Sequence, residues 1–149
     1  MAINILKTQD VLSSTIIRLF LGLVMFPHGA QKLLGWFGGY GFTGTTHFFT
    51  HTMGIPYVFA VLAILAESVG SVGLILGLFT RICAFGVGVT IVVAALMVHS
   101  KIGFFMNWFG TQAGEGYEYH LLVSGMALTL MLTGGGRWSL DSMISQKKD

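Results

Sequence analysis

The sequence predicts an all-α integral membrane protein, a bundle of four helices that cross the bilayer. Hydrophobic residues make up 54% of the 149 residues and charged residues only 9%, with a mean hydropathy of +0.77. A soluble domain carries roughly 25% charged residues, so this composition indicates that lipid surrounds the chain. The apolar residues fall into four long runs, and the length fits one domain that covers residues 1–149.

Each apolar run is expected to form one spanning helix. The expected spans are residues 11–34, 56–78, 82–99 and 117–133. The first two are long enough to cross a hydrocarbon core of ~30 Å, and the other two lie near the minimum of ~17 residues for a span. Pro56 suits the first turn of the second helix. No small-residue cleavage site follows the first run, so we expect that helix to be retained.

The distribution of basic residues predicts the orientation, because short loops rich in Lys and Arg stay in the cytoplasm. The long loops at 36–55 and 100–116 contain one Lys or Arg between them, Lys101. The other cations near the ends of the spans all fall on the opposite side: Lys7, Arg81, Arg137, Lys147 and Lys148. Both termini are therefore expected in the cytoplasm, and the two long loops on the outer side.

Charge and cysteine content exclude two classes of function. The net charge is +2 and the basic residues are scattered, so no nucleic-acid surface is expected. Cys83 is the one cysteine in the sequence, so the chain cannot form an internal disulfide or a CxxC pair. Dithiol redox chemistry within one chain is therefore excluded.

Small residues predict close contacts between helices. Gly73 and Gly77 form a GxxxG pattern on the second expected helix, a spacing that allows two helix backbones to approach closely. One stripe of the first helix combines small residues with two cations: Arg18, Gly22, Met25, Gly29 and Lys32. Pro27 lies inside that helix and removes one backbone donor, which predicts a kink beside His28.

Ionisable residues gather in the outer half of the expected bundle. His28 and Glu67 lie about 9 Å and about 16 Å below the outer ends of the first two helices at 1.5 Å per residue. His99, Glu118 and His120 lie near the outer ends of the last two helices. An ionised group that faces lipid costs at least about 2.5–3.5 kcal/mol, so these side chains should face inward and find partners or a polar ligand.

Each of these residues also has a structural interpretation. Arg18 leans toward the cytoplasmic side, so a hydrogen-bond network or snorkelling competes with an ion pair to Glu67. Glu118 complements the N-terminal dipole of the fourth helix, and His99 and His120 are compatible with ordinary helix ends. His47 and His51 are four residues apart, a spacing that could hold a metal on a helix or simply face the headgroups.

Five segments of the sequence resemble the DoxX family of small bacterial membrane proteins. They are RLFLGLVMFPHGAQKL, AESVGSVGLILGLFTR, MVHSKIGFFMNW, GEGYEYHLL and GGGRWSLD, in the order of the family. The resemblance implies a four-helix bundle in the bacterial inner membrane, related to subunits of thiosulfate:quinone oxidoreductase. The matching positions are Arg18, His28, Gly29, Lys32, Glu67, Gly70, Arg81, His99, Gly103, Phe104, Phe105, Gly114, Glu115, Glu118 and Asp141.

The resulting hypothesis is a quinone-linked redox protein. A quinone needs an apolar slot, hydrogen-bond donors for its carbonyl oxygens and a carboxylate that moves protons. We expect Glu67, His28 and Lys32 to act in catalysis. The residues expected to contact the cofactor are Arg18, His99, Glu118 and His120. Quinone is the expected cofactor, and two histidines facing across the bundle could instead hold haem or a metal.

Two alternatives remain at this stage. The chain could be a non-enzymatic membrane anchor or a small-molecule binding and transport subunit of a redox complex. It could also be a structural subunit whose buried polar groups only fix the register of the helices. The expected partners are the lipid bilayer, a quinone or other small ligand, and a redox partner subunit or further copies of the chain, with no nucleic acid.

Overall fold

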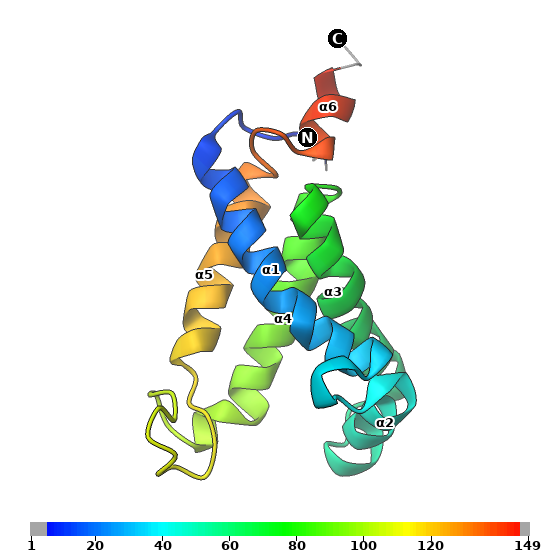
Figure 1. Ribbon diagram of the computed structural model, residues 1–149, viewed down its shortest axis with the longest axis vertical. Helices are drawn as coiled ribbons and strands as arrows, with labels where there is room; N and C mark the ends of the chain where they lie inside the picture. The colour runs from blue at the N-terminus through cyan, green and yellow to red at the C-terminus, as the bar shows by residue number, and fades with distance from the viewer. Residues whose placement is uncertain (1–5, 147–149) are drawn as a thin grey trace.

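The computed structural model describes residues 6–146 and contains only helices and loops over that range, which confirms the all-α prediction. The elements follow one another from the N-terminus to the C-terminus (Figure 1). They are α1 (Leu12–Leu34), η1 (Trp36–Gly38), α2 (Gly41–His47), η2 (Phe48–Thr52), α3 (Tyr57–Leu76), α4 (Thr80–Met97), η3 (His99–Lys101), α5 (Glu118–Thr133) and α6 (Leu140–Gln146).

Three segments of the described chain are long and apolar enough to cross a membrane: Leu12–Leu34, Tyr57–Leu76 and Thr80–Lys101. The fourth expected span is the helix α5, which has 16 residues. At 1.5 Å per residue it is about 24 Å long, shorter than a hydrocarbon core of about 30 Å. The bundle therefore combines three full-length helices with a shorter fourth helix.

The helices pack side by side in the order α1, α3, α4, α5 and spread apart toward one end (Figure 1). We call the end with α6 and the start of α1 the termini end, and the end with α2, η2 and the loop of residues 102–117 the loop end. The ribbons of α1 and α5 lie closer together at the termini end than at the loop end (Figure 1). The buried core joins α1, α3, α4 and α5 and includes Leu21, Met25, Leu74, Val87 and Val123.

Glycine residues of α1 allow direct backbone contact with α3, as the stripe on α1 predicts. A Cβ atom on Gly29 would lie 2.4 Å from the carbonyl oxygen of Glu67, closer than real Cβ contacts. A Cβ atom on Gly22 would lie 2.8 Å from Cγ1 of Ile75. Any larger residue at Gly29 therefore separates the two helices exactly where Glu67 is located on α3.

The GxxxG interpretation of α3 is wrong. Gly77 lies outside the helix as its C-cap and has a φ of 67°, in the left-handed region that glycine adopts without strain. A Cβ atom on Gly77 would lie 2.5 Å from Cβ of Ser139, and one on Gly73 would lie 2.5 Å from Sγ of Cys83. The two glycines therefore serve a helix end and a contact with α4, and they do not form one helix-packing face.

The contacts at the termini end support the charge pattern. The guanidinium of Arg81 donates to the carbonyl oxygen of Lys7 at 3.0 Å, and that of Arg137 bonds Asp10 at 2.9 Å. These three cations thus share one end of the bundle, while Lys147 and Lys148 lie outside the described residues. Assignment of this end to the cytoplasm stays a prediction from the positive-inside rule.

Candidate functional site

A partly buried ion pair joins α1 to α3. Nζ of Lys32 lies 2.5 Å from Oε2 of Glu67. The side chain of Glu67 is 5% exposed and that of Lys32 is 24% exposed, so the carboxylate is the more deeply buried partner. Gly29, one turn before Lys32, lets α1 lie directly against the backbone of Glu67. Pairing offsets the cost of removing the carboxylate from water, and loss of either partner would leave an uncompensated charge.

His28 and Tyr119 lie beside this pair. His28 interacts electrostatically with both Lys32 and Glu67, and Tyr119 interacts with Glu67. The rings of His28 and Tyr119 have centroids 6.4 Å apart, which brings α1 and α5 together at this level. The hydroxyl of Tyr119 lies 3.6 Å from Sδ of Met25. His28 is an exposed residue that lies near Glu67 and Lys32.

Two histidines form a second group at the same end. The rings of His99 in η3 and His120 in α5 have centroids 4.0 Å apart and are tilted by 38°. His120 is 7% exposed, and its Nδ1 is buried without a hydrogen-bond partner among the described residues. The backbone of Gly116 lies near that ring. His28 also interacts electrostatically with His120, which links the two groups.

The hydrogen bond of His99 determines which nitrogen of its ring carries a proton. Nδ1 of His99 lies 2.8 Å from the carbonyl oxygen of Glu115. A carbonyl oxygen can only accept, so Nδ1 must carry a proton. In the neutral ring Nε2 is then an acceptor, and in the protonated ring it is a donor. One side chain can therefore accept from a hydroxyl or donate to a carbonyl, according to its protonation.

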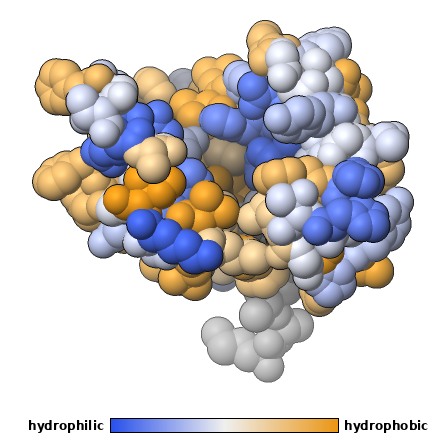
Figure 2. Space-filling view, turned by 90° about the horizontal axis from the view of Figure 1, so that it is seen from below, coloured by the Kyte–Doolittle hydropathy of each residue, from blue (hydrophilic) through white to orange (hydrophobic). Residues whose placement is uncertain are grey.

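The loop end of the molecule is hollowed. Figure 2 shows this face with a depression near its centre and hydrophilic side chains beside the depression. A cavity of about 460 Å³ also opens at this end, between η2 and the end of α4. Its lining residues are Thr52, Met53, Met97, Val98, Lys101 and Ile102. The end that carries the ionisable cluster therefore has space for a ligand.

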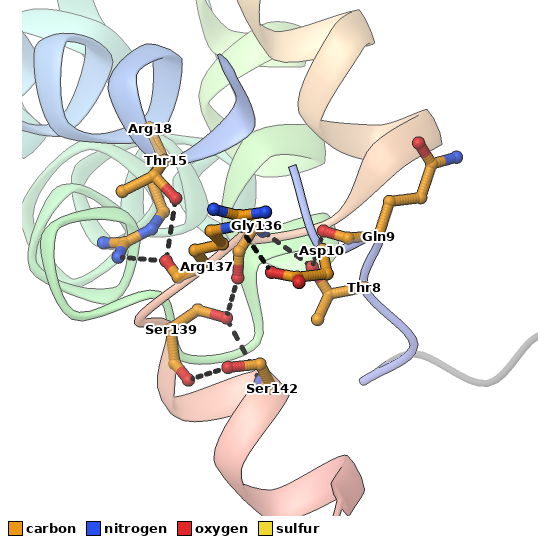
Figure 3. Close-up of polar contacts among 9 residues, drawn as sticks. All are labelled: Thr8, Gln9, Asp10, Thr15, Arg18, Gly136, Arg137, Ser139 and Ser142. Carbon is orange, nitrogen blue, oxygen red and sulfur yellow. Dashed lines mark hydrogen bonds and ion pairs between the residues drawn. The ribbon is translucent and has the colours of Figure 1, made fainter. Parts of the chain in front are cut away.

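Arg18 lies away from this cluster, at the termini end. Its side chain is buried and donates hydrogen bonds to backbone carbonyl oxygens, and it makes no ion pair with Glu67. The acceptors belong to Leu74, Ile75, Gly135, Arg137 and Trp138, at 2.5–3.5 Å. Figure 3 shows Arg18 beside Thr15, with the guanidinium bonded to the carbonyl oxygen of Arg137. The structure thus favours the hydrogen-bond network over a contact with a cofactor.

Glu118 also has a structural partner. Its Oε1 accepts from the backbone N–H of Met106 at 2.8 Å, and Oε2 of Glu115 accepts from that of Asn107 at 2.6 Å. The Glu118 carboxylate therefore holds the loop of residues 102–117 against the start of α5, and the Glu115 carboxylate closes a contact within the loop. This arrangement positions the carbonyl of Glu115 that orients His99, so Glu118 supports the histidine pair indirectly.

The sequence analysis assigned no role to two residues of interest. Tyr119 stands between Glu118 and His120 in the sequence, and its place in GEGYEYHLL was the available signal. Asp141 is 1% exposed and accepts from the backbone N–H groups of Phe79 and Thr80 at 2.8 and 2.9 Å. A carboxylate at these donors caps the start of α4 from a distant segment.

The geometry does not fit a haem held between two facing histidines. The rings of His99 and His120 lie side by side, with too little space between them for a macrocycle. Within residues 6–146, no three His, Cys, Asp or Glu side chains form a group that could hold a metal ion. His47 and His51 do lie together, with ring centroids 4.4 Å apart. They belong to α2 and η2, and each is exposed.

Comparison with known proteins identifies the family. The sequence model described as DoxX matches residues 13–100. The chain belongs to the DoxX family. Over 142 residues it is 32% identical to "Inner membrane protein YqjF" of Escherichia coli (strain K12), which covers 95% of this chain and 98% of that protein. Over 137 residues it is 28% identical to "Putative oxidoreductase CatD" of Bacillus subtilis (strain 168), covering 92% and 90% of the two chains.

No solved structure shows a significant match. The DoxX match ends at residue 100 and thus includes α1, α3 and α4, whereas the two relatives align over lengths that require α5 as well. With its apolar helices and its inner-membrane relative, this DoxX-family protein is a multi-pass protein of the bacterial inner membrane.

Proposed function

We propose that this DoxX-family protein is a quinone-linked redox protein that binds a quinone headgroup at the loop end. The observation that carries the proposal is the convergence of titratable side chains from α1, α3, η3 and α5 beside a hollowed face. The name of the relative from Bacillus subtilis, "Putative oxidoreductase CatD", supports a redox role. The site lies within one end of an apolar bundle, where a lipid-soluble substrate can arrive from the bilayer.

His99 and Lys32 are suited to bind the two forms of the headgroup. Quinone has carbonyl oxygens that need donors, and quinol has hydroxyls that need acceptors. With Nδ1 of His99 occupied by the carbonyl of Glu115, Nε2 donates to quinone when the ring is protonated and accepts from quinol when it is neutral. The Lys32 ammonium has further N–H groups besides the one that bonds Glu67. His120 lies against His99 and completes the binding residues of the proposed site.

Glu67 and His28 are the proposed proton carriers. Reduction of a quinone to a quinol adds two electrons and two protons, so the site must supply protons during the reaction. Glu67 is buried beside Lys32, and the exposed His28 lies within electrostatic range of both. In this assignment His28 exchanges protons with the solvent, and Glu67 holds a proton near the headgroup. Tyr119 keeps α5 beside α1. Arg18 and Glu118 stabilise the surrounding frame.

The electrons must come from a donor other than a dithiol of this chain. Cys83 is the single cysteine of the sequence, so one chain has no dithiol to oxidise. We assign the donor to a redox partner protein or a small reductant that reaches the loop end. Such a partner would dock where the loop residues Trp108 and Phe109 are exposed.

Binding of a tail-less quinone to protein in lipid nanodiscs tests this proposal. Lys32→Met or His99→Phe removes one hydrogen bond to the headgroup and is expected to raise Kd at least about tenfold, because a hydrogen bond to a charged group contributes about 1.5–3 kcal/mol. His47→Phe is the matched control, since it replaces a histidine at the same end outside the cluster. Equal affinity in all variants, with helix content unchanged, would contradict the assignment.

A second candidate is a non-enzymatic binding or transport subunit of a redox complex. The exposure of His28 favours it, because an exposed titratable group can serve passage of a ligand as well as catalysis. The two functions differ in one measurement. In membranes that contain the electron donor, Glu67→Gln should abolish quinone reduction if the chain is catalytic and should leave it unchanged if the chain only binds or carries the ligand.

A further inference from the structure

An open cavity of about 730 Å³ lies at the termini end, between the segment that precedes α1 and residues 137–145. We call it the termini-end cavity. Its volume falls within the range of about 300–1,000 Å³ that is typical of small-molecule sites. The polar groups of its lining are one cation, Arg137, one anion, Asp10, and the hydroxyl groups of Thr8, Ser142 and Ser145. The cavity thus presents a positive and a negative group side by side.

The charged pair of the cavity keeps spare hydrogen-bonding capacity. Nε of Arg137 donates to Oδ1 of Asp10 at 2.9 Å, as Figure 3 shows. Among residues 6–146, no group accepts from the two Nη atoms of Arg137, and none donates to Oδ2 of Asp10. A guanidinium matches the oxygens of a phosphate, and a carboxylate accepts from an ammonium. The pair can therefore hold a ligand that carries both a phosphate and an ammonium group.

The turn that carries Arg137 is built to present side chains outward. The carbonyl oxygens of Arg137 and Trp138 are held from the inside by the guanidinium of Arg18, at 3.5 and 3.0 Å. Trp138 has a φ of 53°, a left-handed conformation that is unfavourable for residues other than glycine, and its side chain is 76% exposed. Strained backbone of this kind is concentrated at functional sites. The buried hydrogen bonds thus keep a guanidinium and an indole at the wall of the cavity.

The cavity lies at the edge of the bilayer. Asp10 precedes the candidate span Leu12–Leu34 by two residues. The backbone N–H of Gln9 donates to the carbonyl oxygen of Thr133, the last residue of α5, at 2.9 Å. Helix α1 therefore begins where α5 ends, and this is the level of the lipid headgroups. An exposed indole such as that of Trp138 is typical of this level, because its ring is amphipathic.

We propose that the termini-end cavity binds one phospholipid with an ethanolamine headgroup. Its phosphate oxygens accept from the Nη groups of Arg137, and its ammonium donates to Asp10. The charges of the lining cancel, so a zwitterionic headgroup satisfies both groups, whereas a purely anionic headgroup would face Asp10 without a donor. A choline headgroup has the same charges but no N–H to donate. The ring of Trp138 then lies beside the first carbons of the acyl chains. This site is at the opposite end from the proposed quinone site and does not depend on it.

Native mass spectrometry of the delipidated full chain in detergent tests the headgroup. The chain is titrated with phosphatidylethanolamine, phosphatidylcholine and phosphatidylglycerol that carry identical acyl chains. The ethanolamine lipid should bind about fivefold more tightly than the choline lipid, the upper limit for one pair of exposed charged groups. Equal affinity for the three lipids would overturn the proposal. Tightest binding of phosphatidylglycerol would also overturn it, because the cavity would then select an anionic headgroup.

Two substitutions separate the roles of the charged groups. Arg137→Gln should weaken binding of the ethanolamine and choline lipids alike, about fivefold, because both carry the phosphate. Asp10→Asn should remove the preference for ethanolamine over choline. Lys101→Gln is the matched control, since it removes an exposed cation at the loop end, and it should change each affinity less than twofold. The proposal is wrong if Arg137→Gln behaves as Lys101→Gln does, or if the preference survives Asp10→Asn. Unchanged helix content verifies that these exposed substitutions leave the fold intact.

Water-soluble glycerophosphoethanolamine distinguishes a lipid from a free phosphate compound. It carries the same headgroup without acyl chains, so it should bind at least about tenfold more weakly, the effect of about two methylene groups removed from water beside Trp138. Trp138→Ala should weaken binding of the lipid and change binding of the soluble compound less than twofold. Equal affinity of the lipid and the soluble compound would mean that the cavity serves a soluble phosphate compound, which overturns the assignment to a lipid.

Discussion

The two ends of the bundle use polar residues in opposite ways. At the termini end, Arg18 and Asp141 are almost completely buried, and both bond backbone groups of distant segments. At the loop end, Lys32 and Glu67 bond each other, while His28 is exposed and Nδ1 of His120 has no partner among the described residues. The termini end is also where α1 and α5 lie closest (Figure 1). Thr80, whose hydroxyl is buried without a partner, is the exception at that end.

This difference separates an end whose buried charged groups are fully engaged by the backbone from an end whose titratable groups keep spare hydrogen-bonding capacity. Buried donors and acceptors that bond each other contribute to one defined structure, and they leave no capacity for a ligand. Titratable groups with spare hydrogen-bonding capacity cost stability but can bind a substrate or move a proton. Loss of a buried polar group at the termini end should therefore act on stability alone, whereas substitutions within the loop-end cluster should change ligand binding as well.

Arg18→Ala should have the largest effect on stability. The substitution leaves several buried carbonyl oxygens of α3 and of residues 135–138 without their donor. The free energy of unfolding should fall by about 3–5 kcal/mol, because each lost bond to a charged donor contributes about 1.5–3 kcal/mol and the losses are not additive. Denaturant unfolding in mild detergent measures this change in the free energy of unfolding.

Arg137→Ala is the matched control at the same end. Arg137 pairs with Asp10 through side chains that are 50% and 77% exposed, and exposed pairs contribute under about 1 kcal/mol. If the two arginine variants lose equal stability, the contrast between buried and exposed cations at the termini end is incorrect.

Gly29→Ala should have the next largest effect, and it tests the contact on which the loop end depends. The added Cβ would meet the carbonyl oxygen of Glu67, so α1 and α3 must separate and the Lys32–Glu67 pair must lengthen. We expect a loss of about 3 kcal/mol, at the upper end of overpacking costs. Gly125→Ala is the control, because a Cβ there has no neighbour within 4 Å. A neutral Gly29→Ala variant would show that the helices are not in direct backbone contact.

The Lys32–Glu67 pair should show strong coupling. Glu67→Gln or Lys32→Met alone should each destabilise the protein by about 2 kcal/mol, less than the 3–5 kcal/mol for a fully buried pair because the lysine is partly exposed. The double variant should lose less than the sum, since no charge remains unpaired. A double-mutant cycle of unfolding measures the coupling, and simple additivity would mean that the two groups do not interact.

Glu115→Gln should have the smallest effect on stability, about 0.5–1 kcal/mol, because its bond to the Asn107 amide lies in an exposed loop. The effect of Glu115→Gln on hydrogen exchange in the loop is more informative than its effect on stability. Hydrogen exchange at the Asn107 amide should accelerate, whereas Thr111→Ala in the same loop should leave that amide unchanged. Unaltered exchange in Glu115→Gln would show that the carboxylate does not hold the loop.

The sequence predicted the four long helices and several of the polar residues that their packed faces carry. Lys32 and Gly29 share one stripe of α1 by helical spacing alone, and the depth of Glu67 brings it within reach of that stripe. His99 and His120 were placed at one level by counting residues from the ends of their helices. Such predictions succeed because helix geometry is regular and because charges avoid lipid.

The remaining features depend on loops and on tertiary contacts. The partners of Arg18 are carbonyl oxygens of residues 135–138, whose positions follow from a chain turn with positive φ at Gly136 and Trp138. The helical spacing of residues in the sequence does not predict the positions of these carbonyl oxygens. The role of Glu118 follows from the path of the loop of residues 102–117.

A high-resolution structure of the protein with a tail-less quinone bound tests the central claim most directly. We expect density for the headgroup at the loop end, within hydrogen-bonding distance of Nε2 of His99 and of Nζ of Lys32, with Glu67 still paired. Density at the termini end near Trp138, or a loop end unchanged at saturating quinone while the ligand lies among lipid-facing side chains, would contradict it.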